Sequence, residues 1–152
     1  MRTLYFDLDG TILIGDTGMA KPALADGKLE LAVQQAGINR LICVGSIVDI
    51  VAVAEEVDAT YCKMDALFKL CGGVFADKAW FSENVLLARS SEMRAREVNL
   101  KDDWWYVDDM AQYYFRVADR EDIFLSNYGG RIMVPSPCGD GQDVVTWMKA
   151  MK

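Results

Sequence analysis

Residues 3–11 read Thr-Leu-Tyr-Phe-Asp-Leu-Asp-Gly-Thr, an apolar run that ends in two aspartates spaced one residue apart. Such a run is typical of a buried strand. Alternate side chains of a strand point to the same face, so we expect Asp7 and Asp9 to converge where the strand passes into a loop. Two neighbouring carboxylates repel each other unless a divalent cation or a shared proton relieves the repulsion. The stretch therefore predicts a strand that leads into a metal site.

A second acidic pair follows a second apolar run near the other end of the chain. Residues 104–107 read Trp-Trp-Tyr-Val, and Asp108 and Asp109 come directly after them. If the two runs are neighbouring strands of a parallel sheet, their carboxyl ends open on the side where such sheets bind ligands. Either pair alone also fits an ordinary turn or helix cap. Together they favour four carboxylates at one crevice.

The rest of the chain alternates strand-like runs with helical patterns. This order predicts a doubly wound, Rossmann-like α/β fold, with a mostly parallel sheet of five strands and helices on both faces. A length of 152 residues suits one domain, 1–152.

The glycine-rich segment 12–19 predicts a turn or short hairpin over the site. Segment 74–83 has no clear pattern, and its aromatic residues favour packing on the core over a substrate-access wall. Beyond the opening strand and residues 104–107, the expected strands are 40–45, 84–88 and 131–134, and the expected helices are 22–36, 47–56, 60–70, 110–117 and 143–151.

Composition excludes several classes of function. The net charge of −7 argues against a nucleic-acid surface, because binding phosphate backbones needs clustered Lys and Arg. The opening apolar run is interrupted by Asp7 and Asp9, and no uncharged stretch reaches the roughly 18 residues of a membrane span. We therefore expect a cytoplasmic protein without a membrane partner. The chain has no histidine, which excludes Ser-His-Asp and Cys-His catalysis and His-ligated zinc.

Three of these stretches resemble motifs of the haloacid dehalogenase superfamily. Residues 7–11, Asp-Leu-Asp-Gly-Thr, are similar to its first motif, and residues 106–109, Tyr-Val-Asp-Asp, to its acidic fourth motif. Residues 40–46, Arg-Leu-Ile-Cys-Val-Gly-Ser, are similar to its second motif, a strand that ends in Ser or Thr. The resemblance covers residues 3 to 110. It implies a minimal member without a cap domain, because a flap and one helix fill the interval from Asp9 to Ser46.

The third motif of this family, a Lys or Arg that neutralises the nucleophile and the phosphate, is where the chain departs from the pattern. No Lys at a helix start stands out between Ser46 and Asp108. Arg89 ends the apolar run 84–88 and is the preferred substitute, with Arg94, Arg96 and Lys101 left open.

The resemblance implies a Mg²⁺-dependent phosphatase that works through an aspartyl-phosphate. Asp7 would be the nucleophile and Asp9 the general acid and base. Mg²⁺ would be held by Asp7, the Asp9 carbonyl, Asp108 and Asp109. The remaining implied residues would bind phosphate: Gly10, Thr11, Ser46 and Arg89.

The substrate and the fate of the phosphoryl group stay open at this stage. The resemblance implies a small-molecule phosphomonoester or a phosphorylated macromolecule, since an open site either accepts large substrates or is closed by a partner subunit of a homo-oligomer. One alternative function is a phosphotransferase that uses the same intermediate. Another is a catalytically impaired domain that binds phosphate or metal.

Overall fold

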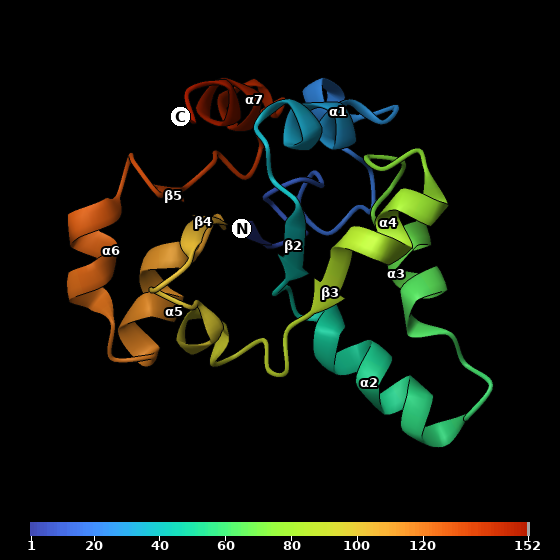
Figure 1. The fold of residues 1–152 in the computed structure, drawn as a ribbon. Helices are drawn as coiled ribbons and strands as arrows, with labels where there is room; N and C mark the ends of the chain where they lie inside the picture. The colour runs from blue at the N-terminus through green and yellow to red at the C-terminus, as the bar shows by residue number, and fades with distance from the viewer. Residues whose placement is uncertain (152) are drawn as a thin grey trace.

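Five parallel strands form the centre of the computed structural model, which describes residues 1–151 (Figure 1). Their order in the sheet is β3-β2-β1-β4-β5, and every pair of neighbours is parallel. The first strand in the chain is thus the central one, with β2 on one side and β4 on the other. The strands are β1 (Arg2–Phe6), β2 (Arg40–Cys43), β3 (Val85–Leu87), β4 (Asp103–Val107) and β5 (Ile132–Met133).

The register of the three central strands determines where the acidic residues meet. Phe6, the last residue of β1, pairs with Cys43 of β2 and Val107 of β4. The ladder continues for one more hydrogen bond, from the Asp7 N–H to the Val107 carbonyl at 3.1 Å. Asp7 and Asp108 therefore leave the sheet side by side at its carboxyl edge.

Helices cover both faces of the sheet, which confirms the doubly wound α/β prediction (Figure 1). One face packs against α1, α3, α4 and α7, and the other against η2, α5 and α6. The helices are η1 (Pro22–Leu24), α1 (Lys28–Gln35), α2 (Ile47–Val57), α3 (Lys63–Leu70), α4 (Lys78–Asn84), η2 (Arg94–Glu97), α5 (Ala111–Val117), α6 (Glu121–Asn127) and α7 (Gln142–Lys149). Within the described residues, no helix is both long enough and apolar enough to span a bilayer.

The segment after β1 folds back as a short flap, as predicted. Leu13 forms an antiparallel bridge with Ala20, and the Ile14 N–H donates to the Met19 carbonyl at 2.8 Å. Ile12 and Leu13 are buried, which anchors the flap on the core. Segment 74–83 contributes buried Phe75 and most of α4, so it packs on the core as the aromatic residues indicated.

The sequence prediction of the helices differs from the structure in the expected helix 22–36 and in α4, η2 and α6, which were not expected as helices. The expected helix 22–36 is split into η1 and α1, because Asp26 and Gly27 both adopt positive φ angles, 54° and 75°. Helix α6 was not expected from the sequence. It begins immediately after a turn in which Asp119 has a φ of 59°.

Candidate active site

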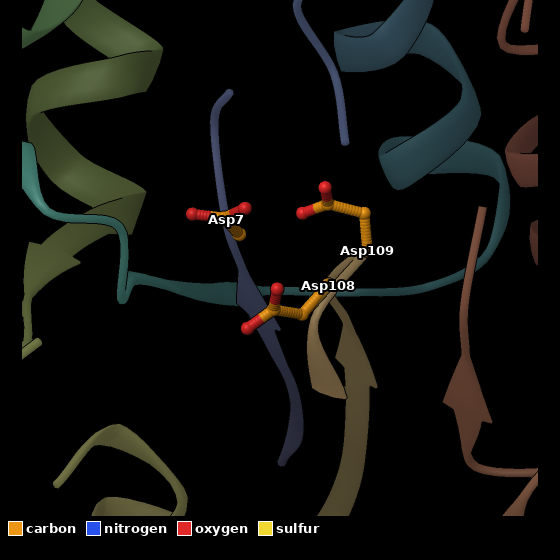
Figure 2. A group of neighbouring side chains, drawn as sticks. All are labelled: Asp7, Asp108 and Asp109. Carbon is orange, nitrogen blue, oxygen red and sulfur yellow. The ribbon is translucent and has the colours of Figure 1, made fainter. Parts of the chain in front are cut away.

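Three aspartates from the two ends of the chain converge at the carboxyl edge of β1 and β4 (Figure 2). Each of Asp7, Asp108 and Asp109 offers one carboxylate oxygen, and these oxygens lie within 4.8 Å of one another. Asp7 and Asp108 are buried, and Asp109 is half-buried. Three carboxylates at this separation form a site of high negative potential inside the protein.

The Asp108 carboxylate is held by three hydrogen bonds. The Tyr106 hydroxyl donates to Oδ2 at 2.8 Å, the Met110 N–H to Oδ1 at 2.9 Å, and Arg94 to Oδ2 at 3.0 Å. Tyr106 and Asp108 are two residues apart, so the pleat of β4 places them on the same side. These bonds fix the orientation of the carboxylate.

Thr11 connects the two acidic segments. Its hydroxyl lies 3.1 Å from Asp7 Oδ2 and 3.4 Å from Asp109 Oδ1, and the same oxygen accepts the Asp109 N–H at 3.0 Å. The side chain is fully buried. Thr11 thus positions the carboxylates with its hydroxyl.

Arg94 is the cation of the site. Its Nη1 lies 3.2 Å from Asp7 Oδ1 and 3.0 Å from Asp108 Oδ2, and the side chain is only 3% exposed. The guanidinium is fixed from two further directions, by a hydrogen bond from Nε to the Ser91 carbonyl and by the ring of Tyr114, whose centroid is 3.6 Å from Cζ. One positive charge is therefore held between two of the three carboxylates.

The predicted substitute for the third motif is corrected by this geometry. The Arg89 side chain is 97% exposed and approaches only Glu97, at 4.0 Å, so it does not reach the acids. Arg94, one of the alternatives left open, is the residue that contacts Asp7 and Asp108. The sequence contained no signal that separates Arg94 from Arg89 or Arg96, because the segment that carries them has no regular period.

Burial and like charge dominate the electrostatics of the acids. The pKa of Asp7 is raised well above its ordinary value by burial and by Asp108, and Arg94 opposes this shift. Burial also raises the pKa of Asp108, against the lowering effect of Arg94. One guanidinium does not compensate three carboxylates, so full ionisation needs additional positive charge.

The donor set fits a hard divalent cation. Carboxylate and carbonyl oxygens are the ligands that Mg²⁺ prefers, and the three acids supply the oxygens at a suitable mutual distance. The Asp9 carbonyl is a further oxygen at this edge, and none of the backbone hydrogen bonds among residues 1–151 uses it. A cation here would also relieve the repulsion that raises the pKa values.

The structure places the Asp9 side chain outside the three-acid cluster but beside it. Asp9 is exposed, and it lines a cavity of about 160 Å³ together with Asp7, Asp108 and Asp109. Its pKa is raised by partial burial, by Asp16 and by Asp109. A carboxyl group with a raised pKa at the mouth of this cavity is suited to carry a proton.

Ser46 lines the same cavity from the other side. It is the residue before α2, it is exposed, and its hydroxyl does not cap the helix. The N–H groups at the start of an 11-residue helix point out of its N-terminus and carry partial positive charge. Ser46 borders the cavity at the start of α2, where the Val48 and Asp49 N–H groups bond the carbonyls of Gly45 and Ser46 at 3.0 and 3.2 Å.

The backbone amides of Gly10 and Thr11 are engaged inside the flap, contrary to their predicted role. The Gly10 N–H bonds the carbonyls of Leu13 and Gly15, at 2.9 and 3.1 Å, and the Thr11 N–H bonds that of Leu8 at 3.1 Å. Neither amide is directed at a phosphate in this geometry. The prediction treated the loop as an open phosphate cradle, whereas its amides close the turn.

Gly45 and Lys21 belong to the site although the sequence did not predict them, and Gly10 has a role there other than the predicted one. A Cβ on Gly45 would lie 2.9 Å from Asp7 Oδ1, and a Cβ on Gly10 would overlap the Asp109 carboxylate. The acids therefore approach the backbone where only glycine fits.

Lys21 is buried, and its Nζ donates to the carbonyls of Gly10 and Ser136, both at 2.8 Å. A lysine before Pro22 carries no sequence signal of burial.

Comparisons with known proteins add no assignment: no family model matches this chain, and neither the curated proteins nor the solved structures contain a significant match.

Proposed function

We propose that this protein is a Mg²⁺-dependent phosphatase that forms an aspartyl-phosphate on Asp7. The observation that carries the proposal is the convergence of Asp7, Asp108 and Asp109 at the carboxyl edge of two adjacent strands, with Arg94 between Asp7 and Asp108. A phosphoryl-transfer site needs mainly positioning and charge compensation, and this arrangement supplies both.

Asp7 is the proposed nucleophile. One carboxylate oxygen forms the bond to phosphorus while the bond from phosphorus to the leaving oxygen breaks. Thr11 and Arg94 hold the carboxylate in one orientation, and Gly45 leaves room for Oδ1. Asp7, Asp108, Asp109 and the Asp9 carbonyl would hold the metal ion. When bound, Mg²⁺ lowers the charge repulsion between the carboxylates and the phosphate.

Asp9 is the proposed general acid and base. It gives its proton to the leaving oxygen in the first step, and the pKa raised by partial burial, by Asp16 and by Asp109 favours this role. In the second step it takes the proton of the water that splits the aspartyl-phosphate, which returns Asp7 and releases inorganic phosphate. Ser46 and the start of α2 bind the phosphoryl oxygens.

A second candidate function is phosphate or metal binding without turnover. Arg94 already neutralises part of the charge on Asp7 and Asp108 and donates to both. If this ion pair persists in the presence of phosphate, Asp7 is restrained from attack.

Covalent labelling separates the two candidates. We expect the chain, quenched with acid during turnover of p-nitrophenyl phosphate and Mg²⁺, to carry one phosphoryl group on the peptide that contains Asp7, detected by mass spectrometry. D7N should carry none, and the surface variant D122N, which makes the same change on α6, should label like the wild type. Saturable Mg²⁺ and phosphate binding with no label would favour the second candidate. A label transferred to an added sugar or nucleoside would identify a phosphotransferase.

A further inference from the structure

A second cavity, of about 630 Å³, lies on the sheet face that packs against η2, α5 and α6. Its floor comes from β1, β2 and β3, and its far wall is the segment 89–102. Leu86 of β3 lines this cavity and is 49% exposed. Among the described residues, this cavity has no lining residue in common with the cavity beside the acids.

Two polar groups at the floor of this cavity have hydrogen-bond donors without acceptors. Arg40 Nε is buried and has no hydrogen-bond partner among residues 1–151. The Tyr5 side chain is 2% exposed, and its hydroxyl accepts the Asn99 N–H at 3.0 Å but donates to no described group. Buried donors without acceptors are unfavourable, so both groups favour a ligand that supplies acceptor oxygens.

Positive charge gathers at the mouth of the cavity in a chain whose net charge is −7. Arg89 and Arg96 are exposed lining residues and add two guanidinium groups to that of Arg40. Glu97 also lines the cavity; its carboxylate accepts the N–H groups of Arg89 and Ser90 at 2.8 to 2.9 Å and lies 4.0 Å from the Arg89 guanidinium. With Asp102, two lining acids face three arginines, so the lining keeps one excess positive charge.

The cavity also has apolar lining residues. Ile42, Leu86 and Leu87 line it from the sheet, and Met93 and Val98 from the opposite segment. A cavity of this size with apolar walls and a few convergent polar groups is typical of a small-molecule site.

We propose that this cavity, defined by Tyr5, Arg40, Arg89 and Arg96, binds a small amphipathic anion. The anionic group is a carboxylate, sulfonate or phosphate that accepts hydrogen bonds from Arg40 and Tyr5, and an apolar or aromatic body fills the space between β3 and Met93. The site is independent of the proposed phosphatase chemistry, since none of Asp7, Asp9, Asp108 and Asp109 lines it.

The probe for this site is 8-anilinonaphthalene-1-sulfonate, which joins one sulfonate to aromatic rings. We expect saturable binding of one probe per chain by fluorescence and calorimetry. N-phenyl-1-naphthylamine, which lacks the sulfonate, should bind at least about tenfold more weakly, because it forms no charge-assisted hydrogen bonds. With ¹³C-methyl-labelled methionine, the Met93 signal should shift on binding and the signal of Met110, which lies elsewhere, should not.

Arginine variants locate the probe. R40Q and R96Q should each weaken binding by about tenfold. The matched control is R116Q, because Arg116 is an exposed arginine that lines a different cavity of similar size between α5 and α6. R116Q should change the affinity by less than about twofold. If R40Q fails to fold, the exposed Arg96 still tests the site. Absence of saturable binding, equal effects of R116Q and R96Q, or a shift of Met110 in place of Met93 would overturn the proposal.

Discussion

At the scale of single residues, the ionised carboxylate of Asp7 destabilises the folded chain. Its folded-state pKa is raised by burial and by Asp108, so ionised Asp7 is less stable in the folded chain than in the unfolded chain. This destabilisation is absent below the unfolded pKa, grows as the pH rises, and is complete above the folded pKa. Sites that gather like charges for function commonly cost stability in this way.

We therefore expect D7N to be more stable than the wild type at pH 8 without divalent ions, and the difference to shrink as the pH falls towards 5. The asparagine can direct its oxygen to Arg94 and its amide to the Thr11 hydroxyl, so it needs no ionisation to keep these contacts. Urea unfolding monitored by circular dichroism measures the difference. A destabilised D7N at pH 8 would contradict this account.

Asp103 provides a control with the opposite sign. Hydrogen bonds from Arg2 and Arg131 lower its pKa. Its stabilising contribution is therefore present above the unfolded pKa and is lost as the pH falls through the folded pKa. D103N should be less stable than the wild type at pH 8, and this loss should disappear at low pH. Asp103 is partly exposed, so we expect a modest effect.

Asp9 should show its role through the choice of leaving group. If it protonates the leaving oxygen, D9A should slow hydrolysis of an alkyl phosphate by about 10²- to 10⁴-fold. Nitrophenolate leaves without a proton, so the loss on p-nitrophenyl phosphate should be much smaller. D122A, which removes an exposed acid on α6, is the control and should slow both substrates little. An equal loss on both substrates for D9A would exclude the general-acid role.

At the scale of secondary-structure elements, Lys21 holds the flap after β1 against the loop between β5 and α7. Its ammonium group links the flap at Gly10 to the β5–α7 loop at Ser136. K21M removes both hydrogen bonds and leaves two carbonyls without this donor, so we expect a loss of about 2 to 3 kcal/mol in the free energy of unfolding. Urea unfolding at pH 7 measures it. K149M, at an exposed position, should change stability by less than about 0.5 kcal/mol.

The elements of the sheet could be predicted from the sequence because buried parallel strands are continuous apolar runs with little ambiguity. All five were found, and so was the flap. Helices α4 and α6 were missed, since each has seven residues, too few for a clear hydrophobic period. Each has one buried side chain, Phe81 in α4 and Phe124 in α6. The break between η1 and α1 depends on the positive φ of Asp26, which sequence patterns do not specify.

The sequence predicted those residues of the candidate site that directly follow a strand. Asp7 and Asp108 follow directly from the ends of β1 and β4. Arg94 lies in a short 3₁₀ turn, and its approach to the acids depends on the path of a loop and on packing against Tyr114. The prediction for Gly10 and Thr11 differs from the structure for a related reason. Which carbonyls their N–H groups bond depends on the backbone conformation of the flap, which the sequence pattern does not specify.

At the scale of the whole molecule, the acidic cluster joins parts of the chain that are about a hundred residues apart. β1 and β4 are adjacent in the sheet, and each continues directly into one side of the cluster. The cluster forms only when the sheet is assembled, so a cation that needs all three acids binds the folded chain and not the unfolded chain. Such binding must stabilise the entire domain.

Mg²⁺ should therefore raise the unfolding temperature in a saturable way. At a concentration one hundred times the dissociation constant, the expected stabilisation is about 2.7 kcal/mol. For a chain of this length, that corresponds to a rise of roughly 5 to 10 °C. Differential scanning calorimetry at constant ionic strength measures it, because any salt screens the repulsion in a protein of net charge −7. D108N keeps hydrogen-bonding groups at the position but removes one ligand charge, and it should lose the shift. An equal rise in the wild type and D108N would show that Mg²⁺ acts as a general counterion, and the three acids would then not form a metal site.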